Sequence, residues 1–510
     1  MSRIKIGWAG RDISTDKPLN MPGQFHMRII RGILDPLTVT ALVVENNDDI
    51  AIFVSGDFID CRSHILDDLR AMVTQRYPQI PGEKIMINAT HTHTAASHVG
   101  GIGSISFTKG EAFSHEGVEI GDSSQYREFL VAQMYDAVCE AYENRQEGGI
   151  SYGYGFAVVA FSRRVVFFDD LSKRPGALQD AAHGVDGHVR MYGDTSDPNF
   201  SHYEAGADPF VNLMFTFDQQ NQLTGAIINI PCPSQNSEDE YFISADYWHD
   251  VRTAIREKYG NIFILPQCAA AGDLSPRQLH YQQAQQRRYR LKYGDIETKA
   301  ENKTEIINRK EIAQRVCQCF DDVYSWAKQE ILTDVPVRHS VQTVMLPKRM
   351  VTEEEYQRTL KNFEDVQDAA FTYDGTPLEN LHHNSQLMSQ RGRCRRIMAR
   401  YENQTNDNIL PMELHVVQIG DIAFATNRFE IFMDYQHRIQ ARSPFVQTFV
   451  VQLTAQPNLD NGSYLPTERG LWGKGFGASI YDNQVTPEAG QIIVEETVKT
   501  LHRLAQQDDV

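Results

Sequence analysis

The chain has 510 residues, of which 41% are apolar and 23% charged, so it can bury a large core and is not globally disordered. Its 49 basic and 67 acidic residues give a formal net charge of −18, which argues against broad binding to nucleic acid or anionic membranes, although a local basic patch remains around residues 391–396. No apolar run is long enough to cross a bilayer, the start of the chain lacks a signal-peptide pattern, and seven scattered cysteines indicate reduced thiols, so we expect a cytoplasmic protein without stable membrane association.

The first 145 residues alternate between strand-like and helix-like stretches. Runs of β-branched residues predict strands, and apolar residues at helical spacing predict amphipathic helices. In chain order we expect an N-terminal strand, a hairpin of strands 38–44 and 50–54 around the turn 46–49, a helix over 63–75, a strand over 84–88 and a helix over 124–145. A hairpin is foreign to a purely parallel sheet, so this order predicts a mixed α/β fold.

The polar stretch 163–209 is rich in Gly, Asp, Asn, His and Pro, which predicts a long functional loop. After it we expect strands over 211–217, 225–230 and within 413–430, and helices over 248–258, 310–329, 353–373, 377–400, 436–442 and 485–507. The Gln- and Arg-rich segment 278–303 predicts a solvated helix or an insertion. Without a repeat or a linker, we expect one domain over 1–510, with a helical insertion near 278–400.

The strongest chemical signal is the pair His91 and His93, directly after the strand over 84–88. On an extended chain, residues two apart point to the same face, so both imidazoles can converge on one ion, or one can bind it while the other reaches a substrate. Two hydrogen-bonded polar residues at a strand end are the structural alternative. The position favours a metal site.

Other segments carry weaker signals. Gly272-Asp273 permits a tight turn that leaves Ser275 near the surface of a cleft, or it is a small-residue turn under a sheet. Cys232 follows a strand between two prolines, where a small buried hydrophobe is the commoner role. Glu430 lies among aromatic residues, and Tyr464 lies near the C-terminus. For each of these two, ordinary capping or packing is the alternative.

Together these segments resemble the neutral/alkaline, non-lysosomal ceramidase family of zinc amidohydrolases. The resemblance rests on the order of an opening strand over 7–13, Ala-Thr-His-Thr-His at 89–93, Gly-Asp-Leu-Ser-Pro at 272–276, Phe-Glu at 429–430 and the Tyr464 region. It implies a ceramidase-like catalytic domain of stacked mixed β-sheets flanked by helices. The family's C-terminal immunoglobulin-like domain is not expected here.

The resemblance also assigns roles by position. His91, Glu430 and Tyr464 would be zinc ligands, and His93 would contact the substrate or the attacking water. Ser275 would occupy the place of the active-site serine, and Asp273, two residues before it, is a further expected catalytic residue. Arg163, or equally its neighbour Arg164, would bind the reacting group.

One departure concerns the family's second histidine ligand, whose segment here contains Cys232 instead. A thiolate is a good zinc donor, so we expect Cys232 to complete the ligand set, with weaker activation of bound water because the site gains negative charge. The alternatives are a degenerate site, or His202 from the polar loop as the ligand.

The resemblance therefore implies a zinc-dependent hydrolase of an amide or related acyl bond. Since no membrane anchor is evident, we expect a polar small molecule or glycoconjugate as substrate. One rival is a carbohydrate-active enzyme (glycoside hydrolase or lyase) on the same scaffold, with Asp57, Asp273 and Glu204 in acid–base roles. Another is a non-catalytic binding protein that has lost the metal. The oligomeric state stays open.

Overall fold

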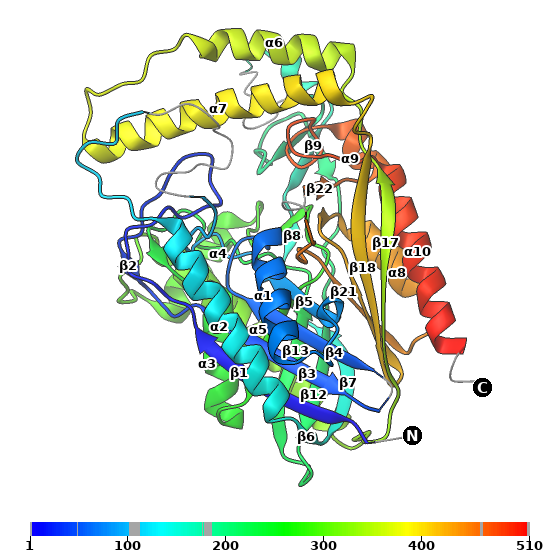
Figure 1. Ribbon diagram of the computed structural model, residues 1–510. Helices are drawn as coiled ribbons and strands as arrows, with labels where there is room; N and C mark the ends of the chain where they lie inside the picture. Colours follow the sequence, from blue (N-terminus) through cyan, green and yellow to red (C-terminus); the bar gives the residue numbers. More distant parts are fainter. Residues whose placement is uncertain are drawn as a thin grey trace.

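The computed structural model describes residues 3–47, 49–100, 113–175, 177, 186–458 and 463–506. Within these residues, three large sheets form the body of the molecule (Figure 1). The first has the strand order β5-β4-β3-β1-β6, made of β1 (Lys5–Asp12), β3 (Thr38–Glu45), β4 (Ile50–Gly56), β5 (Ile85–Ala89) and β6 (Gln146–Glu147). The second is β15-β13-β12-β7, made of β7 (Gly149–Phe156), β12 (Phe210–Phe217), β13 (Leu223–Ile230) and β15 (Phe263–Cys268). The third is β17-β18-β19-β21, made of β17 (Val337–Pro347), β18 (Ile409–Ile419), β19 (Ile422–Thr426) and β21 (Gln447–Val451).

The predicted mixed α/β fold is confirmed, because each of the three large sheets contains both parallel and antiparallel strand pairs. The expected hairpin is β3 and β4, which pair antiparallel from Val39↔Gly56 to Glu45↔Ile50, and Asp48 of its turn lies outside the described residues. β4 then pairs parallel with β5, which places the chain that follows β5 at the end of the sheet. The two predicted helices are α1 (Ser63–Arg76) and α2 (Ser123–Glu143), and both bury their apolar faces.

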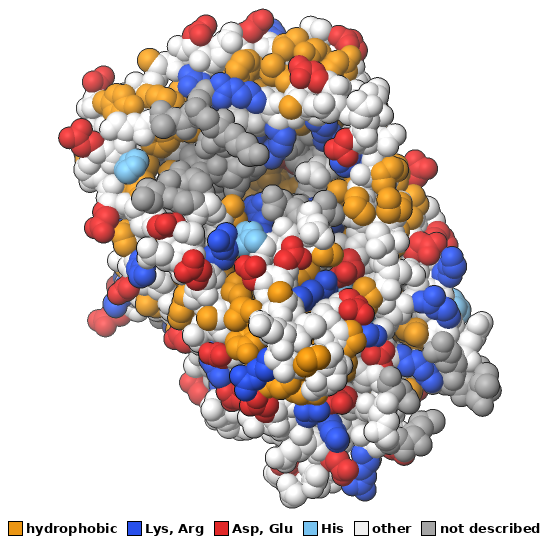
Figure 2. Space-filling view, in the orientation of Figure 1, with side chains coloured by type: hydrophobic (Ala, Val, Ile, Leu, Met, Phe, Trp, Pro, Cys, Tyr) orange, Lys and Arg blue, Asp and Glu red, His pale blue; other side chains and the backbone are white. Residues whose placement is uncertain are grey.

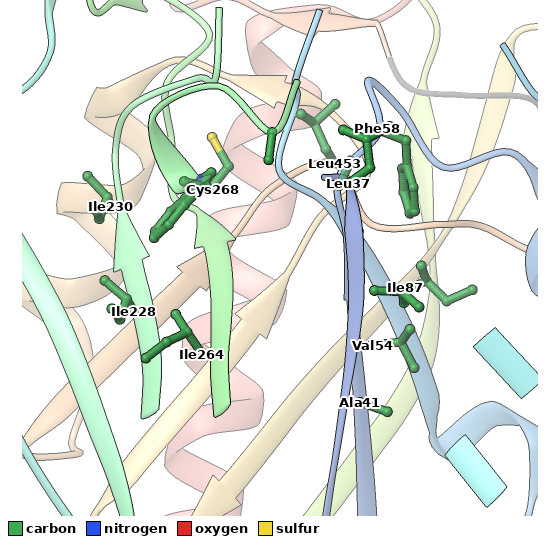
Figure 3. Close-up of a cluster of buried hydrophobic side chains, with 14 of the residues drawn as sticks. Leu37, Ala41, Val54, Phe58, Ile87, Ile228, Ile230, Ile264, Cys268 and Leu453 are labelled. Carbon is green, nitrogen blue, oxygen red and sulfur yellow. The ribbon is translucent and has the colours of Figure 1, made fainter. Parts of the chain in front are cut away.

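Apolar side chains of all three sheets share one core. Trp8 and Phe53 come from the first sheet, Met214 from the second, and Phe424 and Phe449 from the third. A second and larger core packs α1 and α2 against β3, β4 and β5, and continues to β13 and β15, where Figure 3 shows Ile228, Ile230, Ile264 and Cys268. Strands such as β3 and β4 bury apolar side chains on both faces, one face in each core, and this packing holds the sheets in a stack.

Two short strand pairs matter most for the site. β8 (Phe161–Ser162) pairs antiparallel with β16 (Leu274–Ser275), and β20 (Glu430–Ile431) pairs parallel with β22 (Tyr464–Leu465). A third pair joins β2 (Gly32–Ile33) to β14 (Phe242–Ile243). These pairings join segments 34 residues apart (Glu430 and Tyr464), 112 apart (Ser162 and Leu274) and 210 apart (Gly32 and Phe242).

The polar stretch 163–209 is in part a small sheet rather than a loop. Its strands are β9 (Arg164–Phe167), β10 (Val189–Met191) and β11 (Phe200–Tyr203), in the order β10-β9-β11. Val165 and Phe167 form a local apolar cluster beneath it, which explains why strands form in a polar segment. Residues 176 and 178–185 of this stretch lie outside the described residues.

The helices of the expected 278–400 insertion fall into two groups, because β17 interrupts them. β17 is not among the strands predicted from the sequence, although buried and less buried residues alternate over part of its length. α5 (Lys303–Ala327) packs against α3 (Tyr247–Tyr259), and α4 (Gln282–Tyr293) contacts α5. α6 (Glu353–Gln367) and α7 (Pro377–Asn403) form a separate pair at one end of the molecule (Figure 1). The remaining helices are α8 (Met433–Arg442), α9 (Glu468–Gly473) and α10 (Pro487–Gln506), with short 3-10 turns at Gly82–Lys84 and Leu171–Lys173. Among the described helices, none combines the length and apolar character needed to span a bilayer.

Candidate active site

A cavity of about 960 Å³ lies between α7 and the segments that carry the predicted site residues. Figure 2 shows a hollow on this side of the molecule. The cavity is lined by five of the residues predicted from the sequence: His91, His93, Arg163, Glu430 and Tyr464. They belong to four separate segments of the chain, so the tertiary structure brings together most of the predicted site.

The two histidines follow β5, but their convergence does not come from strand alternation. His91 has a left-handed backbone with φ of 65°, a conformation that costs energy in a non-glycine residue and is common at functional sites. Its Nδ1 atom lies 2.7 Å from the carbonyl oxygen of Ile59, which accepts only, so the proton is on Nδ1. The Nε2 atoms of His91 and His93 are 3.3 Å apart. Burial lowers the pKa of the His91 imidazole, but the neighbouring Glu430 carboxylate outweighs it, so this pKa lies above its ordinary value.

Glu430 and Tyr464 lie side by side because they are paired residues of β20 and β22. The carboxylate of Glu430 lies 3.3 Å from His91 Nε2. Gly272 makes this approach possible: a Cβ atom there would lie 2.3 Å from the carbonyl oxygen of Glu430. This close contact gives a physical reason for glycine in the Gly-Asp-Leu-Ser-Pro segment.

Of the two adjacent arginines, Arg163 faces the site. Its guanidinium donates to the Tyr464 hydroxyl at 3.0 Å and to the Gly272 carbonyl at 2.8 Å, and it lies 3.7 Å from the Glu430 carboxylate. Arg164 points the other way and forms a buried, two-pronged ion pair with Glu204 at 2.8 and 2.9 Å. The choice left open by the sequence therefore falls on Arg163 for contact with the cavity.

The protonation states of Glu430, His93 and Tyr464 are set by their burial and by the charged groups beside them. Burial raises the pKa of the Glu430 carboxyl, but His91 and Arg163 outweigh it, so this pKa lies below its ordinary value. Burial and neighbouring positive charges hold the pKa of His93 well below its usual range, which keeps its ring neutral at pH 7. Burial raises the pKa of Tyr464 well above its usual range, so its hydroxyl keeps its proton.

Two further residues of the site were not predicted. Glu238 lies 3.4 Å from His93 Nδ1 and forms an ion pair with Arg277 at 2.7 Å, and burial raises its pKa. Gln235 accepts from Arg163 at 3.3 Å. Glu238 belongs to the acidic run 238–240, which resembles an exposed surface in sequence, so only the fold could identify it.

Ser275 is one layer behind the cavity wall. Its hydroxyl oxygen accepts from the Tyr192 hydroxyl and from the Arg277 backbone N–H, both at 3.2 Å. Tyr192 lines the cavity and, like His91, has a positive φ of 55°. The structure thus places Tyr192 between Ser275 and the cavity.

Asp273 occupies a capping position. Its carboxylate accepts from the backbone N–H of Met433 at 3.0 Å, at the start of α8, and burial raises its pKa to about 6.

The raised pKa of Asp273 makes its contribution to stability depend on pH. Because the folded protein holds this proton more tightly than the unfolded chain, that contribution is present below about pH 4 and is lost as pH rises to about 6. We expect Asp273→Asn to remove this decline, so that above pH 6 its free energy of unfolding exceeds that of the native protein by about 3 kcal/mol. Parallel urea titrations at pH 4 and pH 7 would measure it, and an equal decline in both proteins would contradict it.

The structure does not bring Cys232, the fourth predicted ligand, to this cluster. Its side chain is fully buried in the large apolar core, and its sulfur lies 3.5 Å from the carbonyl oxygen of Val159. Burial, with Cys268 nearby, raises its thiol pKa well above the usual range, which disfavours a thiolate. The position corresponds to the small buried hydrophobe that the sequence left as the alternative.

The other candidates also lie outside the described lining of the cavity. Asp57 is fully buried and paired with Arg252 at 2.7 Å, and Glu204 is paired with Arg164. His202 is exposed on β11, where its ring nitrogen contacts the hydroxyl of Ser201. The expected acid–base roles of Asp57 and Glu204 gain no support from these positions.

The donors around His91 suit zinc in two respects. Ligand atoms about 2.0–2.1 Å from a tetrahedral ion lie about 3.3–3.4 Å from each other, as do His91 Nε2 and Glu430 Oε2. The Nδ1 contact of His91 with a carbonyl is the outer-shell arrangement of metal-binding histidines. Within the described part of the chain, however, no three His, Cys, Asp or Glu side chains are grouped to hold an ion.

Comparison with known proteins supports the fold. The neutral ceramidase from Pseudomonas aeruginosa superposes with a TM-score of 0.63 over 99% of this chain and 75% of its own, at 16% sequence identity. A ceramidase complexed with C2 gives a TM-score of 0.63 over 99% of this chain and 76% of its own, at 14% identity. No protein-family model and no curated protein sequence matches the chain. The chain therefore has a ceramidase-like fold.

Proposed function

We propose that this chain is a zinc-dependent hydrolase of an amide or related acyl bond in a polar small molecule or glycoconjugate. The observation that carries the proposal is the convergence of His91, His93, Glu430, Tyr464 and Arg163 on one cavity of a ceramidase-like fold. His91, Glu430 and Tyr464 would hold the ion, and His93 would face the water molecule beside it. When bound, zinc would polarise the scissile carbonyl and acidify a water molecule.

The residues would divide the remaining work. His93 is neutral, so its Nε2 atom can take a proton from the attacking water and return it to the leaving nitrogen. Glu238, 3.4 Å from Nδ1 and held by Arg277, would stabilise the imidazolium formed in between. Arg163 keeps its charge beside Tyr464 and would stabilise the negative charge that develops on the carbonyl oxygen.

Metal content and hydrolysis test the proposal together. We expect about one zinc per purified chain, loss of activity on chelation and recovery with added zinc, measured by elemental analysis and by release of free amine from a panel of polar N-acyl compounds and long-chain ceramide. Hydrolysis that survives complete metal removal would exclude zinc dependence. Turnover of long-chain ceramide without turnover of polar amides would exclude the substrate class.

A carbohydrate-active enzyme is the second candidate, and one observation favours it. Glu430 and Glu238 contact the same histidine pair, and their pKa values are shifted in opposite directions, as in paired acid–base carboxyls. Release of reducing ends from an oligosaccharide panel, lost in Glu238→Gln, would favour this function over amide hydrolysis.

A further inference from the structure

Arg163 is held by hydrogen bonds on both ends of its guanidinium. Its Nη2 atom donates to the Gly272 carbonyl at 2.8 Å and to the Tyr464 hydroxyl at 3.0 Å. Its Nη1 atom donates to the side-chain oxygen of Gln235, a buried residue, at 3.3 Å. Because a guanidinium is planar, partners on both Nη atoms fix the orientation of the whole group. Gln235 therefore helps to determine where Arg163 faces.

A chain of hydrogen bonds continues from Gln235, and its direction follows from the chemistry of Arg163. An arginine side chain has donors only, so the oxygen of the Gln235 amide faces Arg163 and its N–H₂ group faces the other way. There the amide donates to the Tyr192 hydroxyl at 3.3 Å. The Tyr192 hydroxyl in turn donates to Ser275 Oγ at 3.2 Å. Hydrogen bonds that run in one direction strengthen each other, so these four residues act together.

The backbone brings the members of this chain to one place. Ser275 in β16 is paired with Phe161 in β8, two residues before Arg163. The backbone N–H of Tyr192 donates to the carbonyl of Arg163 at 2.8 Å. The positive φ of Tyr192, 55°, is a strained conformation for a bulky residue, and such residues cluster at functional sites. The fold therefore holds Tyr192 at the cavity in spite of an energetic cost.

Tyr192 also connects the two charged parts of the site. Through Gln235 it reaches Arg163, which is proposed to stabilise the carbonyl oxygen. On its other side, the Arg277 guanidinium lies 5.6 Å from the centroid of the Tyr192 ring and forms an ion pair with Glu238 at 2.7 Å. Glu238 is the carboxylate beside His93 Nδ1. A change at the Tyr192 hydroxyl is therefore expected to affect catalysis.

We propose that Gln235, Tyr192 and Ser275 are positioning residues that hold Arg163 toward the reacting carbonyl. Ser275 then acts through Tyr192 and is not the nucleophile, because Tyr192 lines the cavity and stands between it and the Ser275 hydroxyl. The catalytic consequence rests on the proposed function, whereas the orientation of Arg163 does not.

Kinetics of single and double variants test the catalytic consequence. We expect Tyr192→Phe and Gln235→Leu each to lower kcat for the best N-acyl substrate about tenfold or more, with KM within about twofold, because a misplaced group slows the reaction without weakening binding. The double variant should lose no more than Gln235→Leu alone, since both changes act through Arg163. Losses that multiply in the double variant, or an unchanged kcat in either single variant, would overturn the proposal.

Ser275→Ala separates a positioning role from a nucleophilic one. We expect kcat to fall by about tenfold, as in Tyr192→Phe, whereas loss of a nucleophile would lower it at least about 1000-fold. Tyr203→Phe is the matched control, because it removes a hydroxyl that contacts His280 Nδ1 at 2.8 Å, from a residue outside the described lining of the cavity. Its kcat should stay within about twofold of the native value. A 1000-fold loss in Ser275→Ala would contradict the proposal.

Crystal structures of the native protein and of Gln235→Leu test the orientation of Arg163 without any substrate. We expect the guanidinium to move by about 1 Å or more from its native position in Gln235→Leu, and to keep that position in Tyr203→Phe. An unmoved guanidinium in Gln235→Leu would overturn the proposal. If the guanidinium moves but the native protein hydrolyses no N-acyl compound, the proposed function is wrong and the positioning of Arg163 by Gln235 stands.

Discussion

Replacing His91 with alanine is expected to abolish zinc binding and to lower kcat/KM for the best N-acyl substrate at least about 1000-fold, equivalent to about 4 kcal/mol of transition-state stabilisation. His91 is the centre of the cluster: its Nε2 atom lies 3.3 Å from both His93 and Glu430. No other described side chain makes both contacts. Elemental analysis and steady-state kinetics on the purified variant would measure the two effects.

His202→Ala is the matched control for this experiment. It removes an imidazole of the same kind from exposed β11, at the residue that the sequence left as an alternative ligand. We expect its zinc content and kcat/KM to stay within about twofold of the native protein. If His91→Ala keeps its zinc and His202→Ala loses it, the assignment of the metal to this cavity is wrong.

Glu204→Ala is expected to lower the free energy of unfolding by about 3–5 kcal/mol, because it leaves the buried charge of Arg164 without its counter-charge. The Arg164 and Glu204 side chains are 1% and 2% exposed, and the pair is bidentate. Arg164 also donates to the carbonyls of Gly470 and Lys474, which would remain but would not cancel its charge. Urea denaturation would measure the change.

A surface pair with the same chemistry provides the control. Arg442 and Glu495 also form two hydrogen bonds, both of 2.7 Å, but their side chains are 43% and 46% exposed. Glu495→Ala should therefore cost less than about 1 kcal/mol. A similar small loss in Glu204→Ala would show that the buried pair does not stabilise the fold, and would leave an acid–base role for Glu204 open again.

The site could be predicted in part because some of its residues carry chemistry in a recognisable order. His91 and His93 stand out after an apolar strand, and the order of the Gly-Asp-Leu-Ser-Pro, Phe-Glu and Tyr464 segments suggested the fold that the comparison supports. The reason given for the convergence of the two histidines was nevertheless wrong. The left-handed conformation of His91, and not strand alternation, sets their relative position.

Other residues could not be assigned from the sequence, because their surroundings come from distant segments. The position of Cys232 after a strand allowed either a ligand or a core residue, and only the packing of β13 against β15 places its sulfur in the core. Glu238 contacts His93, which lies 145 residues earlier in the chain, and Arg277, which lies 39 residues later. Arg163 and Arg164 are equivalent in sequence, but they face opposite sides of the chain.

The sequence by itself determined most of the local elements, though not β17 or the strands within 163–209. It also determined the mixed α/β character and the chemical types available to the site, because apolar periodicity and side-chain identity are local properties. The tertiary structure alone decided which polar groups share the cavity, since that depends on the pairing of β20 with β22 and of β8 with β16, across separations that local patterns do not encode. It also decided the charge around the cavity, whose described lining has eight Lys and Arg residues against six Asp and Glu residues. An acidic chain can enclose a positive surface when the fold gathers its arginines from several segments around one space.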